Sequence, residues 1–317
     1  MKIAVTGASG FVGRSFTSLL DASSIDYISL DRLSSFDENP AAFDNHFYVD
    51  YSDIVSLKRI LNGCDIVVHL AGRAHKPSVH DKNCEIEKFK IANIDCLINV
   101  ITASKSVGVR RIIFVSSIGV LGDHTNGIPF SETSSPNPTQ LYAKSKYEAE
   151  LALLSSLSAD NSFEWVILRP PLIYGPICPG NMAKLIKAVK VFPVLPFAHI
   201  YSVKSFISVN NFVDILSYCI SSDRVVNQVF NVSDCDDLSV RDMFLCILQG
   251  LDKSCIGFFG CPPFILRVIF NIFGFGSVWR QLSSELVIDS SRFQAITGWT
   301  PPYSSREQLR LTAKSFL

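Results

Sequence analysis

The feature that most constrains the fold is a glycine-rich turn near the start of the chain. Lys2–Thr6 is predicted as a short buried strand, and the turn at residues 6–13 (TGASGFVG) follows it and opens a helical stretch. Gly7 allows a tight turn, Gly10 lets the backbone approach a pyrophosphate, and Gly13 lets the helix pack closely on the strand. Free N–H groups at the helix start would face the phosphates. The turn predicts a dinucleotide site, although a plain strand-to-helix turn with the same GxxGxxG spacing is the alternative.

Short β-branched runs alternate with longer helical stretches over the first 120 residues, and one further strand is expected before Pro170. The predicted elements after the turn are strands at Ile25–Leu30, Ile66–Leu70, Arg111–Val115 and Trp165–Leu168, with helices near Ser56–Leu61 and across Glu87–Ser106. Strands separated by helices imply right-handed crossovers and a parallel sheet that is covered on both faces. We therefore expect an α/β fold with a Rossmann-type doubly wound parallel sheet.

The rhythm changes after Pro170, where prolines punctuate short segments up to Pro196. This pattern predicts a smaller, irregular C-terminal region that binds the substrate. The expected division is a dinucleotide-binding domain at 1–170, to which 206–222 returns, and a substrate-binding region at 171–205 and 223–317.

Composition excludes several classes of protein. Hydrophobic residues make up 48% and charged residues 18%, which is enough apolar material for a sizeable core. Lys+Arg and Asp+Glu are both 29, and this balance argues against a nucleic-acid-binding protein. The nine cysteines form no CxxC pair, which favours reduced thiols in the cytoplasm.

One apolar segment is long enough to be compared with a membrane span. Residues 255–279 are nearly all apolar, but Pro262, Pro263, Arg267 and Asn271 interrupt them. No uninterrupted run of about 18 uncharged residues exists, so we expect no transmembrane span. Peripheral membrane contact stays open.

Asp31 ends the second predicted strand, where a carboxylate can accept both ribose hydroxyls of an adenosine. A carboxylate there would repel a 2′-phosphate, so Asp31 favours NAD. Arg32 could bind that phosphate and keeps NADP open. The alternative for Asp31 is a solvated residue at a strand end.

Tyr142 and Lys146 are spaced to share one face of a helix. The ammonium group of Lys146 would lower the pKa of the Tyr142 phenol, and an oxidised nicotinamide would lower it further. Tyr142 could then act as a general acid and base near neutral pH. Ser117 follows the strand at Arg111–Val115, at the edge where ligands of open α/β sheets bind, and Ser116 is the alternative candidate. On its own, a Tyr and a Lys at this spacing more often lie on an ordinary helix surface than in a catalytic site.

Together these residues resemble the extended short-chain dehydrogenase/reductase superfamily, in its NAD-dependent nucleotide-sugar epimerase/dehydratase family. The matching pieces span the chain: Thr6–Gly13, Asp31, Asp50, His69–Gly72, Asn93, Ser116–Gly122, Tyr142–Lys146, Leu168–Pro176, Val287–Arg292 and Gly298–Pro302.

The resemblance implies roles for individual residues. Catalysis would fall to Ser117, Tyr142 and Lys146. The cofactor would be held by Gly7, Gly10, Phe11, Val12, Asp31, Arg32, Asp50, Tyr51, Leu70, Ala71, Asn93, Tyr142, Lys146 and Pro171. Besides Ser117, the substrate would meet Asn181, Lys204 and Arg280, with solvated surface charges as the alternative for the two cations. The resemblance implies no metal. It does imply a homodimer that forms through the helix at Tyr142–Leu154.

Two departures narrow the implied reaction. Ile118-Gly119 follows Ser117, where the dehydratases of the family carry an Asp-Glu pair, and no Cys and His additions of the C3/C5 epimerases are evident. Redox chemistry at C4 of a UDP-sugar remains. The segment Val203–Asn211 and the apolar stretch after Pro262 resemble a bacterial surface-polysaccharide group.

Within that group the implied activity is a UDP-hexose(NAc) 4-epimerase for surface-polysaccharide precursors. The alternatives are the UDP-N-acetylquinovosamine dehydrogenase, a UDP-4-keto-6-deoxy-sugar 4-reductase, and a non-catalytic dinucleotide-sensing protein.

Overall fold

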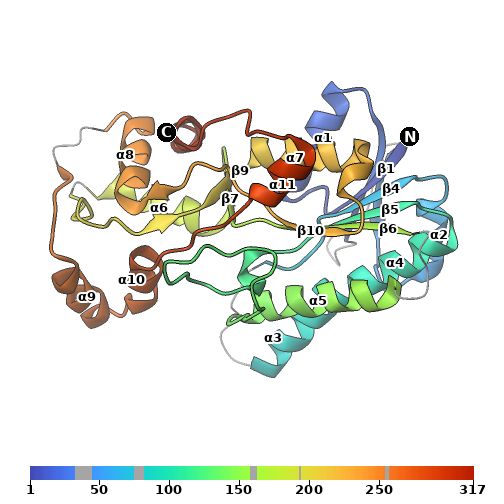
Figure 1. Ribbon diagram of the computed structural model, residues 1–317, viewed down its shortest axis with the longest axis horizontal. Coiled ribbons are helices and arrows are strands. Elements are labelled where there is room, and N and C mark those ends of the chain that lie inside the picture. Colours follow the sequence, from blue (N-terminus) through green and yellow to red (C-terminus); the bar gives the residue numbers. More distant parts are fainter. Residues whose placement is uncertain (33–44, 75–81, 158–162, 193, 254–256) are drawn as a thin grey trace. The chain divides into compact units, whose positions relative to one another are not determined.

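The computed structural model describes the chain except for residues 33–44, 75–81, 158–162, 193 and 254–256. The chain forms two compact units (Figure 1). Unit 1 comprises Met1–Gly122, Ser135–Arg169 and Val213–Phe230, and unit 2 comprises Asp123–Ser134, Pro170–Phe212 and Asn231–Leu317. The segment that returns to unit 1 is thus Val213–Phe230, whereas the sequence suggested 206–222.

Unit 1 is built on an α/β alternation. Its elements are β1 (Lys2–Thr6), α1 (Phe11–Ala22), β2 (Asp26–Arg32), β3 (His46–Val49), α2 (Ile54–Leu61), β4 (Ile66–His69), α3 (Lys82–Phe89), a π-helical turn (Lys90–Asp95), α4 (Cys96–Ser106), β5 (Arg111–Val115), a 3-10 turn (Ile118–Val120), α5 (Leu141–Leu157), β6 (Glu164–Arg169), the larger part of α7 (Val209–Ser221), a second 3-10 turn (Asp223–Val225) and β10 (Gln228–Asn231).

The strands form one seven-stranded sheet in the order β10-β6-β5-β4-β1-β2-β3. Every pairing from β6 through to β3 is parallel, with β1 between β2 and β4. The predicted Rossmann-type sheet is therefore confirmed, and all five predicted strands lie in it. The sequence analysis missed the two edge strands, β3 and β10, because edge strands are short and half-exposed and lack a continuous apolar run.

Helices cover both faces of this sheet (Figure 1). One face packs Ala4, Val67 and Phe114 against α2, α4 and α5 in a single buried cluster. On the other face lie α1 and the part of α7 that belongs to unit 1. Burial on both faces explains why β1, β4 and β5 are nearly continuous apolar runs.

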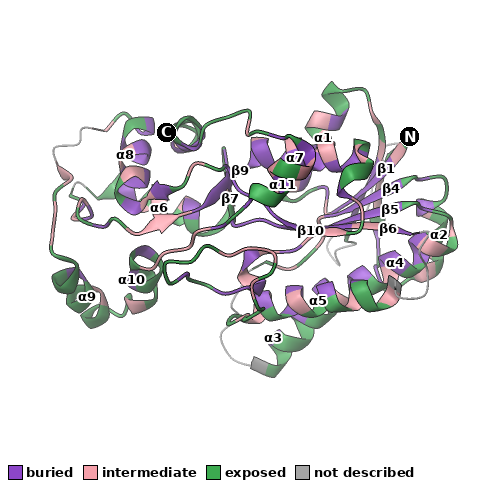
Figure 2. Ribbon diagram, viewed as in Figure 1, coloured by how far each residue is buried: buried purple, intermediate pink, exposed green. Residues whose placement is uncertain are grey.

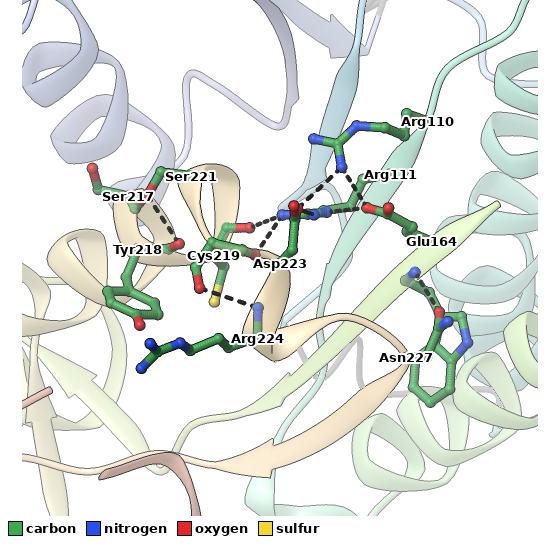
Figure 3. Close-up of polar contacts among 12 residues, drawn as sticks. Arg110, Arg111, Glu164, Ser217, Tyr218, Cys219, Ser221, Asp223, Arg224 and Asn227 are labelled. Carbon is green, nitrogen blue, oxygen red and sulfur yellow. Dashed lines mark hydrogen bonds and ion pairs between the residues drawn. The ribbon is translucent and has the colours of Figure 1, made fainter. Parts of the chain in front are cut away.

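A buried arginine fastens the amino end of the sheet. Arg111, the first residue of β5, has no exposed surface. Its guanidinium donates to Glu164 Oε2 (2.7 Å), to Asp223 Oδ1 (2.5 Å) and to the carbonyls of Cys219 (2.9 Å) and Ser222 (2.8 Å) (Figure 3). The two carbonyls lie at the C-terminal end of α7, where a cation is favourable. The contacts join α7 to the sheet.

Unit 2 contains shorter elements. They are β7 (Leu172–Tyr174), α6 (Gly180–Val191), β8 (Val203–Lys204), β9 (Phe206–Ser208), the first turn of α7, β11 (Leu238–Ser239), α8 (Val240–Gly250), α9 (Pro263–Ile272), α10 (Gly276–Ser283), α11 (Ser291–Thr297) and α12 (Ser305–Lys314). β7 pairs with β9 in parallel, and β8 pairs with β11.

A buried carboxylate organises the interior of unit 2. Asp234 accepts hydrogen bonds from the Tyr174 hydroxyl (2.8 Å), the Ser208 backbone N–H (2.9 Å), the Asn211 amide (2.6 Å) and the Ser305 hydroxyl (3.2 Å). These donors come from β7, β9, α7 and α12, so one side chain joins four elements. In the described part of the chain, no helix combines the length and apolar character that crossing a bilayer requires.

Candidate active site

The glycine turn leaves the start of α1 open. Gly7 has φ +70°, and a Cβ on it would lie 2.8 Å from the backbone nitrogen of Ala71. A Cβ on Gly13 would lie only 2.3 Å from the Gly7 carbonyl oxygen, so only glycine fits either position. Gly10 caps α1, and no side chain among the described residues caps that end with a hydrogen bond. The free N–H groups and the positive end of the helix dipole suit a pyrophosphate.

Asp31 reaches this turn from the carboxyl end of β2. Its buried carboxylate accepts the Ser9 backbone N–H (3.0 Å) and the Ser9 hydroxyl (2.8 Å), and His46 Nε2 lies 3.1 Å from Oδ2. The carboxylate is thereby fixed beside the helix start, where an adenosine ribose would lie. Arg32 is the next residue of β2 and is exposed. The sequence analysis missed Ser9 and His46, and a hydroxyl residue within the glycine turn was the available signal for Ser9.

These features fit a dinucleotide cofactor. The turn has no Cβ atoms where a pyrophosphate would approach, and a buried acid stands next to it. Phe11 and Val12 form the first turn of α1, directly after the glycine turn, and their contact with a cofactor stays a prediction.

Asp50 and Tyr51 have local partners. The exposed Asp50 accepts the backbone N–H (2.9 Å) and hydroxyl (2.8 Å) of Ser52 and so shapes its own turn. Tyr51 is buried and donates its hydroxyl to the Leu30 carbonyl (3.0 Å), and burial raises the pKa of this phenol well above its usual range. Their place beside an adenine stays a prediction.

The segment after β4 links the glycine turn to α5. The Leu70 and Ala71 N–H groups donate to the Thr6 carbonyl (3.1 Å) and hydroxyl (3.2 Å). Asn93 is fully buried in the π-helical turn, where it accepts the Arg73 N–H (2.7 Å) and donates to Ser145 (2.8 Å). π-helical turns inside helices frequently mark functional sites.

Lys146 reaches the same segment from the other side. A Cβ on Gly72 would lie 3.3 Å from Lys146 Nζ and 3.1 Å from Asn93 Oδ1. Gly7 touches Ala71 at one end of this segment, and Lys146 touches Gly72 at the other. The structure therefore brings the predicted cofactor turn and the predicted catalytic lysine to the same stretch of backbone.

The predicted Ser, Tyr and Lys side chains lie at the carboxyl edge of the sheet and on the start of α5. Ser117 is half-buried, and its hydroxyl accepts the Gly119 N–H (3.2 Å). Ser116 is buried, and its hydroxyl has no partner among the described residues. The open hydroxyl at this edge is therefore that of Ser117. Tyr142 lies in the first turn of α5 with its ring 6.5 Å from that of Phe89.

The electrostatics of this pair differ from the sequence-based expectation. Burial raises the pKa of Tyr142 to about 12 and lowers the pKa of Lys146 to about 8. Lys146 donates to the Val115 carbonyl (2.9 Å) and lies 4.8 Å above the Phe114 ring. Its neighbour Glu150 is paired with Arg169 by two hydrogen bonds of 2.9 and 2.6 Å. For the pKa of the Tyr142 phenol, then, burial outweighs the influence of the ammonium group.

The remaining predicted residues belong to unit 2. Pro171 is buried just beyond β6, and Asn181 is exposed at the start of α6. Lys204 donates to the Ser284 hydroxyl (3.2 Å), and burial lowers its pKa to about 8. Arg280 lines an open hollow of about 620 Å³, and its carbonyl accepts the Ser284 N–H (3.0 Å).

The two predicted cations of unit 2 contact Ser284, which follows α10 directly, in different ways. Lys204 contacts its hydroxyl through the ammonium group, whereas the contact of Arg280 is made by the backbone carbonyl and does not place the guanidinium. Within the described residues, no hydrogen bond or ion pair joins Asn181 to either of them. The described part of the chain also contains no cluster of His, Cys, Asp or Glu side chains that could hold a metal ion.

Comparisons with known proteins agree with this geometry. Residues 3–233 match the family model described as "NAD dependent epimerase/dehydratase family". The UDP-glucose 4-epimerase of Vibrio cholerae is 34% identical over 100% of this chain and 95% of that protein. An Escherichia coli O157:H7 protein named N-acetyl-alpha-D-glucosaminyl-diphospho-ditrans,octacis-undecaprenol 4-epimerase is 28% identical over 80% of this chain and 73% of its own length.

A solved structure shares the fold over the whole chain. The UDP-glucose 4-epimerase of Thermotoga maritima, crystallised with UDP-glucose, superimposes with a TM-score of 0.77 at 22% identity, and the match covers 100% of this chain and 98% of that one. The chain therefore belongs to the NAD-dependent epimerase/dehydratase family and is an NAD-dependent enzyme of the extended short-chain dehydrogenase/reductase type.

Proposed function

We propose that this enzyme inverts C4 of a UDP-hexose or UDP-N-acetylhexosamine and so supplies precursors of a surface polysaccharide. The observation that carries the proposal is the shared segment at Ala71-Gly72, which meets the glycine turn on one side and Lys146 on the other. A cofactor held by that turn would extend along this backbone toward the side chains of Ser117, Tyr142 and Lys146.

NAD, held by the glycine turn and Asp31, would supply a hydride acceptor and donor for oxidation and reduction at C4. Tyr142 would take the proton of the C4 hydroxyl while the C–H bond is oxidised, and would return it when the ketone is reduced. Because burial raises the pKa of the phenol to about 12, its deprotonation near neutral pH needs added positive charge. The buried ammonium of Lys146 supplies part of that charge.

Ser117 would orient the reacting oxygen. Its hydroxyl already accepts the Gly119 N–H, so its own proton is free to be donated to the C4 oxygen. Lys204 and Arg280 would bind the diphosphate, and Asn181 the nucleotide. Lys204 would bind as a point charge without the bidentate geometry of an arginine.

Two features favour epimerisation over the other reactions of the family. Ile118 and Gly119 carry no acid or base next to Ser117 that could assist elimination of water. The relative from V. cholerae and the relative from E. coli are both named as 4-epimerases. The name of the E. coli relative also makes an N-acetylglucosaminyl group on a diphosphate-linked lipid an alternative substrate.

The test is an incubation of the purified protein with UDP-glucose and, separately, UDP-N-acetylglucosamine, without added cofactor. We expect inversion at C4, detected by NMR of the anomeric protons, because an epimerase recycles the NAD with which it is purified. No reaction until a 4-keto sugar and NADH or NADPH are supplied would instead support a 4-reductase. No reaction under either condition, with the lipid-linked sugar as substrate too, would revive a non-catalytic dinucleotide sensor.

We also infer a cytoplasmic homodimer. Leu151 and Leu154 on α5 and Ile98 on α4 are exposed apolar residues on two helices that contact each other. Two copies could bury these residues in a bundle of helices. Sedimentation equilibrium of the wild type and of Leu151→Glu would test this arrangement.

A further inference from the structure

Helix α9 in unit 2 exposes an apolar face along its whole length. Phe264, Ile265, Val268, Ile269 and Ile272 form this surface, which we call the α9 face. The side chains of Phe264 and Ile272 are 69% and 75% exposed. Figure 2 shows α9 as exposed over nearly all its turns. Phe273, Phe275 and Val278 continue the exposed apolar surface toward α10.

The opposite side of α9 attaches the helix to unit 2. Leu266 is buried, and the Phe270 ring lies 6.1 Å from Phe197 and 5.9 Å from Trp279. The helix is therefore apolar on its inner side and on its outer side. A helix that is hydrophobic all round is normally covered on both sides. An exposed apolar patch of this kind marks a contact with another surface.

Charge indicates what that surface is. Between Lys253 and Glu285 the sequence contains two arginines, Arg267 and Arg280, and no aspartate or glutamate. Both arginines are exposed and line the same hollow. Glu285, the next carboxylate along the chain, lines a second hollow with Pro263, and its charge partly offsets the lowering of the Lys204 pKa by burial. The α9 face is thus apolar, and the charged residues of α9 and α10 themselves are both arginines.

A second copy of the chain fits this pattern poorly. In a symmetric dimer the same patch faces itself, so the guanidinium groups would meet a patch with no carboxylate of its own. A bilayer that contains anionic lipids offers the missing complement, because its headgroups carry negative charge and its acyl chains accept the apolar side chains.

We propose that the α9 face, with Arg267 beside it, docks this protein on the surface of a bilayer that contains anionic lipids. α9 has 10 residues and is about 15 Å long, half the thickness of the hydrocarbon core, so it lies in the interface. This inference goes beyond the proposed reaction and holds for whichever sugar reacts.

The test is co-sedimentation of the full-length protein with vesicles. One set consists of phosphatidylcholine alone, and the other of equal parts phosphatidylcholine and phosphatidylglycerol. We expect binding to the anionic vesicles that weakens with added salt and is at least about tenfold weaker on phosphatidylcholine. The double variant Phe264→Glu/Ile272→Glu should lose binding to the anionic vesicles, and Arg267→Gln should bind roughly fivefold more weakly.

The matched control is Ile128→Glu, which changes an equally exposed apolar residue (79%) elsewhere in unit 2 and should bind like the wild type. Melting temperatures would confirm that the variants fold, and Phe264→Ser/Ile272→Ser would replace the double glutamate variant if that protein is unstable. Equal binding to both vesicle types, or undiminished binding by the folded double variant, would overturn the proposal.

Self-association is the remaining outcome that would overturn it. In that case the wild type ignores vesicles, and the double variant turns a dimer into a monomer in sedimentation velocity runs. Turnover of a soluble UDP-sugar should be unchanged in every α9 variant. Failure of the docking proposal is therefore distinguishable from failure of the proposed reaction.

Discussion

Each end of the sheet in unit 1 buries a cation, and the two cations differ in how many hydrogen-bond acceptors surround them. At the amino end, Arg111 is 0% exposed, and two carboxylates and two backbone carbonyls accept its hydrogen bonds (Figure 3). At the carboxyl end, Lys146 is 4% exposed and has one carbonyl and an aromatic ring as its neighbours. None of the ion pairs in the described part of the chain includes Lys146.

This difference separates a structural charge from a functional one. A buried charge with complete partners holds elements together, because its desolvation is offset by hydrogen bonds. A buried charge with incomplete partners is less stable, and its unused electrostatic potential is available to a ligand or a neighbouring group. The pKa of Lys146, lowered to about 8, reflects that incomplete compensation.

The largest effect on turnover should come from removing the phenol hydroxyl of Tyr142, which lies one helical turn from Lys146. We expect Tyr142→Phe to lower kcat by roughly 10²–10⁴-fold, because the general acid and base is removed. Tyr147→Phe, on the same helix, is the matched control and should keep near-normal turnover. Steady-state kinetics with a UDP-sugar measures both, and equal activity of the two variants would contradict the role of Tyr142.

The next largest effect compares the two cations directly. Arg111→Met should reduce the free energy of unfolding by about 3 kcal/mol, because it leaves the carbonyls of Cys219 and Ser222 without donors. Lys146→Met should leave the free energy of unfolding unchanged or raised, while turnover falls about 100-fold. Urea denaturation and kinetics on the same samples provide both numbers.

Arg110→Met is the control for this pair. Arg110 shares Glu164 and Asp223 with Arg111 but is exposed, so its loss should cost less than about 1 kcal/mol. The variants of the two buried cations can also be compared directly. If Lys146→Met lowers the free energy of unfolding as much as Arg111→Met does, the two buried cations do not differ as described.

A smaller effect is expected from pH. Lys146 has a pKa of about 8 in the folded chain and near 10.5 when unfolded, so between these values the unfolded chain binds more protons. The free energy of unfolding should therefore rise from pH 8 to pH 10, by roughly 2 kcal/mol from this group. Above pH 10 the raised pKa of Tyr142 acts in the opposite sense.

Lys204 also has a pKa lowered to about 8 and contributes in the same direction as Lys146. The informative quantity is therefore the difference between wild type and Lys146→Met, measured by urea denaturation at each pH. If the free energy of unfolding changes with pH in the same way in both proteins, the pKa of Lys146 is not lowered by burial, and the prediction is wrong.

The smallest effect concerns the acid beside the glycine turn. Asp31→Asn should weaken NAD binding about tenfold, because an amide accepts the ribose hydroxyls less well than a carboxylate. Asp26→Asn, at the other end of β2, is the control and should bind NAD normally. Calorimetric titration with NAD and with NADP checks both variants, and unchanged affinity of Asp31→Asn would place the ribose elsewhere.

Sequence reasoning reached the features that depend on local pattern. The glycine turn, the Tyr142 and Lys146 spacing and the buried strands each follow from neighbouring residues. It could not reach contacts between distant residues, such as Arg111 with Asp223 or Asp31 with His46 across the end of β2. The degree of burial could not be read from the sequence either, so the rise of the Tyr142 pKa above its ordinary value was not predicted.

The most direct measurement of the whole account uses UDP-glucose that carries deuterium at C4. The purified enzyme is incubated with this substrate in ordinary water, and the C4 epimer is isolated and analysed by mass spectrometry. We predict that the product retains the deuterium, because the hydride that leaves C4 returns to it within one active site. Product in which hydrogen from water has replaced the deuterium, or complete absence of the epimer, would contradict the account.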